Sequence, residues 1–113
     1  MTLQDIVEQL DLTVLTQNKD FNRITPTSGY ASDLLSCVMA GAKKRSVWVT
    51  LQAHANIVAV AALLDLTAVI ITEGALPDAS AIAKANEEDI NLLSTSQPTY
   101  AIVGKLWQMG LKD

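Results

Sequence analysis

The sequence predicts an α/β fold built on a mostly parallel sheet of about five strands. The first observation is that residues 47–72 read as a β-branched run, an apolar run of helix length and a second β-branched run, which is the order of a βαβ unit. The second is that neither β-branched run alternates between apolar and polar residues, which is typical of strands covered on both faces. We therefore expect a sheet with helices on both sides.

The central unit comprises strands over residues 47–51 and 67–71 and a helix over residues 57–64. Branched and aromatic side chains favour the two strands because they pack well on a pleated surface. The helix between them is apolar on every side. Such a helix must be buried all round, or its outer face must meet a second subunit.

The chain before this unit is predicted to hold a helix, two short strands and a second helix. Thr2 can cap the first helix, whose apolar face carries Leu3, Ile6, Val7 and Leu10. Residues 11–16 and 21–25 are the predicted strands, and the order helix, strand, strand allows a mixed sheet. Residues 27–30 read as a loop. Ser32 then caps a helix from Asp33 that is closed by Gly41, with a buried side made of Leu34, Leu35, Cys37, Val38 and Met39.

The chain after the unit predicts a helix, a strand and a final helix. Asp78 or Ser80 starts an amphipathic helix through Asp89, with Ile82 and Ala85 inward. Residues 90–94 form the last strand. A final helix, stopped by Gly110, is expected to turn toward the sheet Tyr100, Val103, Leu106 and Trp107.

Size and composition indicate one compact domain over residues 1–113 and exclude several classes of protein. Hydrophobic residues make up 50% and charged residues 18%, so apolar surface should remain for a partner, and a homodimer is expected. A net charge of −4 argues against nucleic-acid binding. The apolar region is too interrupted to span a membrane. A single cysteine and no signal segment suggest the cytoplasm.

A candidate site lies where strands hand over to helices. If the later strands are parallel, the loops at residues 25–30, 50–56, 72–78 and 94–99 emerge at one edge, beside helix N-termini that suit a small anionic or nucleotide-like ligand. The candidate ligand-binding residues are Ser28, Gly29, Tyr30, Thr50, Gln52, His54, Asn56, Thr72, Glu73 and Gly74. The same loops also carry Thr25, Ser94, Thr95 and Gln97.

His54, the single histidine, has three candidate roles: contact with an anion, acid or base catalysis, or a hydrogen bond that stabilises the turn. Asn56 is most simply the N-cap of the central helix. The chain has no G-x-x-x-x-G-K-[ST] loop and no G-x-S-x-G elbow. One cysteine and one histidine do not make a standard metal site. We therefore expect a protein that is not an enzyme and carries no cofactor.

Three segments resemble the DRTGG domain family: residues 29–36, 48–61 and 70–78. The resemblance covers most of the chain and is weakest before Ile24. It implies a three-layer α/β/α domain that tends to dimerise and acts as a regulatory or assembly module. Members of the family occur beside CBS modules in regulated pyrophosphatases, within some phosphate acetyltransferases, and alone. They are similar to the N-terminal domain of the kinase of the histidine-containing phosphocarrier protein.

This chain departs from the commoner family pattern at two turns. It has Gln52-Ala53-His54 where many relatives carry a Gly-Asp-Arg-like turn, and Thr72-Glu73-Gly74 where they carry Thr-Gly-Gly. Losing an arginine and gaining a glutamate makes the site less attractive to phosphate. The resemblance implies a non-catalytic homodimeric module that binds a small ligand or a protein partner. The alternative is an accessory factor for a hydrogenase-type redox enzyme complex, without a small ligand.

Overall fold

The computed structural model describes all 113 residues and shows one five-stranded sheet. Its strands lie in the order β1-β5-β4-β3-β2. Neighbouring strands from β2 to β5 are parallel, whereas β1 pairs antiparallel with β5 at one edge. The predicted mostly parallel sheet is therefore confirmed. The strands are β1 (Thr13–Val14), β2 (Gly29–Ala31), β3 (Val47–Thr50), β4 (Ala68–Ile71) and β5 (Asn91–Ser94).

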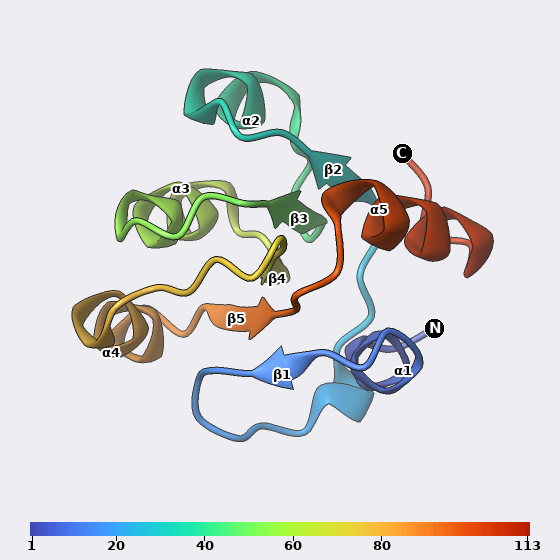
Figure 1. The fold of residues 1–113 in the computed structure, drawn as a ribbon, viewed down its shortest axis with the longest axis horizontal. Coiled ribbons are helices and arrows are strands. Elements are labelled where there is room, and N and C mark those ends of the chain that lie inside the picture. The colour runs from blue at the N-terminus through green and yellow to red at the C-terminus, as the bar shows by residue number, and fades with distance from the viewer.

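Helices cover both faces of the sheet, as the three-layer prediction requires. Figure 1 shows α2, α3 and α4 on one side of the sheet and α1 and α5 on the other. Both chain ends lie on the side of α1 and α5. The helices are α1 (Leu3–Gln9), α2 (Leu35–Gly41), α3 (Asn56–Leu64), α4 (Ala79–Glu87) and α5 (Thr99–Gln108). None of them has the length and apolar character needed to cross a bilayer.

The two apolar layers explain why the strands lack polar alternation. In β3, Val47 and Val49 join the cluster under α1 and α5, while Trp48 joins the cluster under α2, α3 and α4. All four residues of β3 are buried. Successive side chains of a strand point to opposite faces, so a strand between two helical layers must be apolar on both.

The first helix and the first strand match the prediction. Thr2 caps α1 in a capping box, because its side chain accepts from the Asp5 N–H and the Asp5 carboxylate accepts from the Thr2 N–H. Strand β1 keeps only Thr13–Val14 of the predicted residues 11–16.

The predicted strand over residues 21–25 is wrong, and the predicted loop over residues 27–30 contains a strand. Residues Phe21–Arg23 form a 3₁₀ helix, η1, because Asp20 caps the Asn22 N–H and Phe21 inserts into the core at 3% exposure. Strand β2 is Gly29–Ala31, which lies parallel to β3. A Gly-Tyr-Ala run has little strand propensity of its own, so this strand arises from pairing.

Helix α2 begins later and buries less than the sequence suggested. Its N-cap is Leu34, which makes no side-chain capping bond, while the Ser32 hydroxyl accepts from the Leu34 N–H at 3.1 Å in a local turn. Val38 is buried, but Leu34 and Met39 are 61% and 49% exposed, and Cys37 is also exposed. The helix lies at the end of the layer, so only a narrow stripe reaches the core.

Helix α5 turns Leu106 and Val103 toward the sheet as predicted, but the predicted inward positions of Tyr100 and Trp107 are wrong. Ile102 and Leu106 are its buried residues, whereas Tyr100 is 92% and Trp107 52% exposed. Residues four apart lie on one face of a helix. In α5 the face that carries Ile102 and Leu106 packs against the sheet. The Lys112 ammonium lies 5.6 Å from the centre of the Trp107 ring.

Candidate binding edge at the carboxyl ends of the strands

The structure brings seven of the ten candidate residues to one edge of the sheet. Strands β3 and β4 are parallel, so the junctions that follow them leave the same edge. The junction that follows β5 joins them there. We call this the carboxyl edge. The seven residues are Thr50, Gln52, His54, Asn56, Thr72, Glu73 and Gly74. Ser94, Thr95 and Gln97 of the β5–α5 junction lie at the same edge.

The other three candidates do not join this edge. Ser28 and Gly29 lie at the start of β2, where the Ser28 carbonyl accepts from the Val47 N–H at 2.9 Å. Tyr30 lies in the middle of β2, and its hydroxyl donates to the Cys37 carbonyl at 3.1 Å. The prediction that residues 25–30 emerge with the other loops is therefore wrong, because these residues lead into a strand and do not follow one.

Asp33 belongs to the carboxyl edge and was missed as a site residue. One of its carboxylate oxygens accepts from the Thr50 hydroxyl and from the Leu51 N–H, each at 2.8 Å. The Gln52 side-chain amide donates to the Asp33 carbonyl at 3.0 Å. Asp33 thus joins the β2–α2 and β3–α3 junctions. The signal that could have revealed it, a carboxylate just after a strand, was hidden because the strand at Gly29–Ala31 was not predicted.

Thr72 and Glu73 join the β4–α4 junction to the start of α5. The buried Thr72 hydroxyl donates to the Thr50 carbonyl at 3.3 Å and is hydrogen-bonded to the Thr99 hydroxyl. A Glu73 carboxylate oxygen accepts from the Thr99 N–H at 2.7 Å. Pro98, the N-cap of α5, offers no side-chain capping bond. The Glu73 carboxylate therefore occupies the positive end of α5 that an anionic ligand would otherwise use.

The turn after β4 needs two residues with positive φ, Glu73 at 62° and Gly74 at 76°. Their N–H groups donate to the carbonyls of Gln97 and Thr95 at 3.0 and 3.1 Å. The left-handed conformation is natural for glycine and costly for glutamate. The hydrogen bonds to the β5–α5 junction hold it in place.

The His54 side chain accepts a hydrogen bond from the first N–H of the central helix. Its Nδ1 accepts from the Asn56 N–H at 3.1 Å, so the hydrogen-bond network assigns the ring proton to Nε2. Helix α3 begins at Asn56 and its N-cap is Ala55, so the prediction of Asn56 as N-cap is wrong. Of the three candidate roles of His54, the structure shows the hydrogen bond that stabilises the turn. The exposed ring keeps Nε2 without a partner inside the chain.

The carboxyl edge is acidic. Asp78 caps α4 by accepting from the Ala81 N–H at 2.9 Å, and this bond, followed by the hydrogen bond from the Ser80 hydroxyl, lowers the pKa of Asp78. The four junctions, residues 32–34, 51–55, 72–78 and 95–98, contain the carboxylates Asp33, Glu73 and Asp78 and no lysine or arginine. An anionic ligand would meet like charge here.

The carboxyl edge is partly apolar. Four hollows of the molecule are lined by residues outside these junctions. One large apolar side chain projects from each junction or from the helix start that follows it. They are Leu34 at 61% exposure, Leu51 at 44%, Leu76 at 68% and Tyr100 at 92%. No group of three or more His, Cys, Asp or Glu side chains is placed to hold a metal ion.

Comparison with known proteins identifies the fold. No protein-family model matches the chain, and no curated protein matches it. Among solved structures, the chain is similar to the CBS and DRTGG domains of the regulatory region of Clostridium perfringens pyrophosphatase, complexed with the activator diadenosine tetraphosphate. The TM-score is 0.74 at 16% sequence identity, over 91% of this chain and 44% of that chain. The chain therefore has a DRTGG-like fold and spans less than half the length of that regulatory protein.

Proposed function

We propose that this protein is a non-catalytic regulatory module of the DRTGG type that recognises a partner protein through its carboxyl edge. The observation that carries the proposal is that Leu34, Leu51, Leu76 and Tyr100 are all exposed, one at each of the four strand-to-helix connections that follow β2, β3, β4 and β5. Exposed apolar patches of this kind mark interaction surfaces. Tyrosine in particular is enriched in protein interfaces.

The polar groups of these connections support a rigid recognition surface. Asp33 bonds Thr50, Thr72 bonds Thr99, and Glu73 bonds the Thr99 N–H. These bonds join the β2–α2, β3–α3 and β4–α4 junctions and the start of α5. Because the projecting side chains stand on elements that are already ordered, binding a partner costs little conformational entropy.

The negative charge of the carboxyl edge favours a partner protein with a positively charged surface. The four junctions carry Asp33, Glu73 and Asp78 and no lysine or arginine, and one cation, the Lys105 ammonium from α5, bonds the Gln97 side chain. Complementary charge across an interface steers association and rejects wrong partners. The partner therefore presents an apolar patch surrounded by lysine or arginine, as a regulated enzyme or an enzyme subunit can do. The similarity in fold to a pyrophosphatase regulatory region supports a regulatory role.

Co-purification from the source cells tests this proposal with two matched aromatic positions on α5. Tyr100 belongs to the carboxyl edge, whereas Trp107 lies near the other end of the helix and is also exposed. We expect a stoichiometric partner protein with the wild type and with Trp107→Ser. The variant Tyr100→Ser should lose it, and binding of the wild type should weaken at high salt. Equal recovery with both variants would contradict the proposal.

Two copies of the chain are proposed to pair through the outer faces of α2 and α3. Met39 on α2 is 49% exposed, and Leu63 on α3 is 69% exposed although α3 is apolar on every side. Sedimentation equilibrium of the wild type should give the mass of a dimer. The double variant Met39→Ser and Leu63→Ser should be monomeric. A monomeric wild type would refute the pairing of two copies. It would not affect the proposal that the carboxyl edge binds a partner protein.

A second candidate function is the binding of a small ligand at the start of α3. The observation that favours it is that Nε2 of His54 and the side chain of Asn56 make no hydrogen bond within the chain. A thermal-shift panel of nucleotides, including diadenosine tetraphosphate, would test it. A ligand present at a hundred times its Kd stabilises the fold by about 2.7 kcal/mol. An increase in melting temperature that disappears in His54→Ala would support this function. If no compound in the panel raises the melting temperature, this function is rejected.

A further inference from the structure

The opposite edge of the sheet, where β3, β4 and β5 begin, contains an open hollow of about 360 Å³. Its lining residues come from η1 and the loop after it, and from the loops that precede β3, β4 and β5. The polar side chains among them are Arg23, Thr25, Arg45, Asp65, Thr67, Asp89 and Asn91. None of these residues belongs to the carboxyl edge, so the hollow is a separate feature of the molecule.

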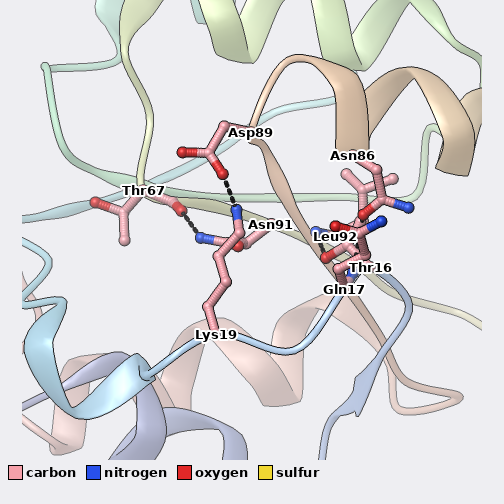
Figure 2. Close-up of polar contacts among 8 residues, drawn as sticks. All are labelled: Thr16, Gln17, Lys19, Thr67, Asn86, Asp89, Asn91 and Leu92. Atoms are coloured by element: carbon pink, nitrogen blue, oxygen red, sulfur yellow. Dashed lines mark hydrogen bonds and ion pairs between the residues drawn. The ribbon is translucent and has the colours of Figure 1, made fainter.

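Asn91 supplies a buried hydrogen-bond acceptor in the wall of this hollow. The residue is only 5% exposed, and its side-chain N–H donates to the Thr67 carbonyl at 3.0 Å (Figure 2). A carbonyl can only accept, so this bond fixes the orientation of the amide. The amide oxygen, Oδ1, then faces the other way and has no partner. Buried oxygens are almost always paired in folded proteins, so this oxygen needs an N–H or O–H donor.

Arg45 supplies a cation that lacks a carboxylate partner. The other charged groups around the hollow are paired: Lys44 with Asp65 at 3.5 Å, Arg23 with Asp20 at 3.3 Å, and Lys19 with Asp89 (Figure 2). The Arg45 guanidinium makes one long contact, to the Thr25 carbonyl at 3.5 Å. It is therefore free to bind an anion.

The backbone of Arg45 is held firmly although its side chain is free. Its φ is 65°, in the left-handed region. Its N–H donates to the Asp65 carbonyl at 2.8 Å, and its carbonyl accepts from the Thr67 hydroxyl at 2.7 Å and from the Thr27 N–H at 3.1 Å. The guanidinium thus starts from a fixed point beside the hollow.

The distribution of charge favours an anion at this edge. Five of the eight lysines and arginines lie on this side of the molecule, at positions 19, 23, 43, 44 and 45. The neighbouring carboxylates Asp20, Asp65 and Asp89 are each neutralised by one of these cations. The whole protein carries a net charge of −4, and the charged residues that line the hollow balance, but the pairing of Asp65 with Lys44 and of Asp89 with Lys19 leaves Arg45 as the charge without a carboxylate partner.

We propose that this hollow binds a phosphate group that still carries a proton. Its charged oxygens accept from the Arg45 guanidinium, in the charge-assisted geometry that arginine favours for phosphate. Its hydroxyl donates to Oδ1 of Asn91. The ion pair of Lys19 and Asp89 lies beside Asn91 (Figure 2), with Asp89 exposed, and the proposal requires this pair to separate so that the phosphate reaches the covered oxygen. Sulfate has similar size and charge but no proton to donate, so the site discriminates against it.

A titration calorimetry experiment on the full chain tests the proposal, with inorganic phosphate, glycerol 3-phosphate and sulfate as probes at low ionic strength. We expect phosphate to bind at least tenfold more tightly than sulfate. Glycerol 3-phosphate should bind more tightly at about pH 5.5 than at pH 8, because a phosphate monoester loses its last proton near pH 6. Tighter binding of the ester identifies a phosphorylated metabolite as the ligand, and tighter binding of phosphate identifies the free anion. Equal affinity for sulfate would overturn the proposal.

Matched variants locate the site. Arg45→Ala should raise the Kd for phosphate at least tenfold, whereas Lys43→Ala, which removes the same charge two residues away and outside the hollow, should leave the Kd within about twofold. Asn91→Ala should abolish the preference for phosphate over sulfate. If Asn91→Ala does not fold, the Kd values for phosphate of Arg45→Ala and Lys43→Ala are sufficient to test the site. Equal weakening by both would show general attraction to positive charge and reject the site.

Discussion

Glu73 illustrates at the level of one residue how the carboxyl edge satisfies its own hydrogen-bond donors. The first N–H groups of a helix lack partners inside the helix, and a phosphate or carboxylate of a ligand often fills that place. In α5 the Glu73 carboxylate does so, by accepting from the Thr99 N–H at 2.7 Å. The anion that this helix attracts is thus part of the chain itself.

Neutralising Glu73 should destabilise the fold. We expect Glu73→Gln to lower the free energy of unfolding by about 1 kcal/mol, because the favourable charge at the start of α5 is lost. The matched control is Glu87→Gln at the end of α4, an exposed glutamate without a bonded partner. Urea denaturation should show no loss for the control. Equal losses would mean that Glu73 acts only through net charge.

Two aspartates make the stability of the fold depend on acidity. The Thr2 N–H lowers the pKa of Asp5 below its ordinary value of 3.8, and the Ala81 N–H followed by the Ser80 hydroxyl does the same for Asp78. A carboxylate whose pKa is lower in the folded state contributes stability above the unfolded pKa. That stability is lost as the pH falls through the folded pKa.

The double variant Asp5→Asn and Asp78→Asn should therefore have a flatter stability profile in acid. Between about pH 5 and pH 2.5, wild-type stability should fall more steeply than that of the variant. Thermal unfolding followed by circular dichroism across this range provides the measurement. Parallel profiles would show that the two caps titrate alike in the folded and unfolded chains.

At the level of the element, α2 depends on the absence of a side chain at Gly41. A Cβ atom there would lie 2.5 Å from the Tyr30 hydroxyl oxygen and 2.7 Å from the ring atom Cε1, far inside ordinary contact. The Tyr30 hydroxyl is held by the Cys37 carbonyl, so the ring cannot move away without losing that bond. Gly41 thus lets α2 pack against β2.

Two glycine variants should have opposite effects on stability. Gly41→Ala should lower the free energy of unfolding by about 1 to 3 kcal/mol through overpacking against Tyr30. Gly104→Ala, in the exposed middle of α5 with no atom within 4 Å of the new methyl group, should raise it by about 1 kcal/mol. Differential scanning calorimetry would measure both. If Gly41→Ala instead stabilised the protein, the Tyr30 ring would have to move aside at little cost in free energy.

The central βαβ unit was predictable because its signals are local. The β-branched runs of β3 and β4 and the apolar run of α3 each favour one conformation, and both strands are buried on both faces. Strand β2 was not predictable in the same way. Gly29, Tyr30 and Ala31 become a strand only because Val47–Thr50 offers a pairing edge. The exposed aromatic side chains of α5 were predicted inward because hydrophobicity alone does not say which of two stripes reaches the core.

The gathering of polar junction residues followed from the parallel order of the strands, but the sequence did not reveal what these residues do. Thr50 and Thr72 were expected to face a ligand, and the structure shows that their hydroxyls are bonded within the chain. Asp33 was expected only as the first residue of a helix, although it joins two junctions. Such pairings depend on distances between segments far apart in sequence. The unpartnered oxygen of Asn91 could not be seen in sequence for the same reason.

At the level of the whole molecule, the C-terminal residues protect the open edge of the sheet. The Lys112 carbonyl accepts from the Gly29 N–H at 3.0 Å, and Leu111 is 4% exposed and packs over Gly29. Uncovered strand edges invite pairing with other chains. The end of the chain therefore acts as a cover for β2.

Removing residues 111–113 should both destabilise the protein and make it associate. We expect a loss of about 2 to 3 kcal/mol from the buried Leu111 side chain and the lost hydrogen bond. Size-exclusion chromatography at several concentrations should show growing oligomers as β2 is uncovered. Removing Asp113 alone is the control and should change neither property. A stable truncated chain that elutes like the wild type would refute the covering role.

The pairing of β1 with β5 constrains the order of folding. Thr13 lies beside Ser94, and Val14 beside Leu93, so the first strand has no partner until the last strand is in place. Contacts so distant in sequence form late, because closing a long loop lowers the entropy of the chain before the contacts that stabilise it are made. During synthesis Thr13 and Val14 must wait until Leu93 and Ser94 have been made. Pulse-labelled hydrogen exchange during refolding should accordingly protect the amides of β3 and β4 before those of β1 and α1.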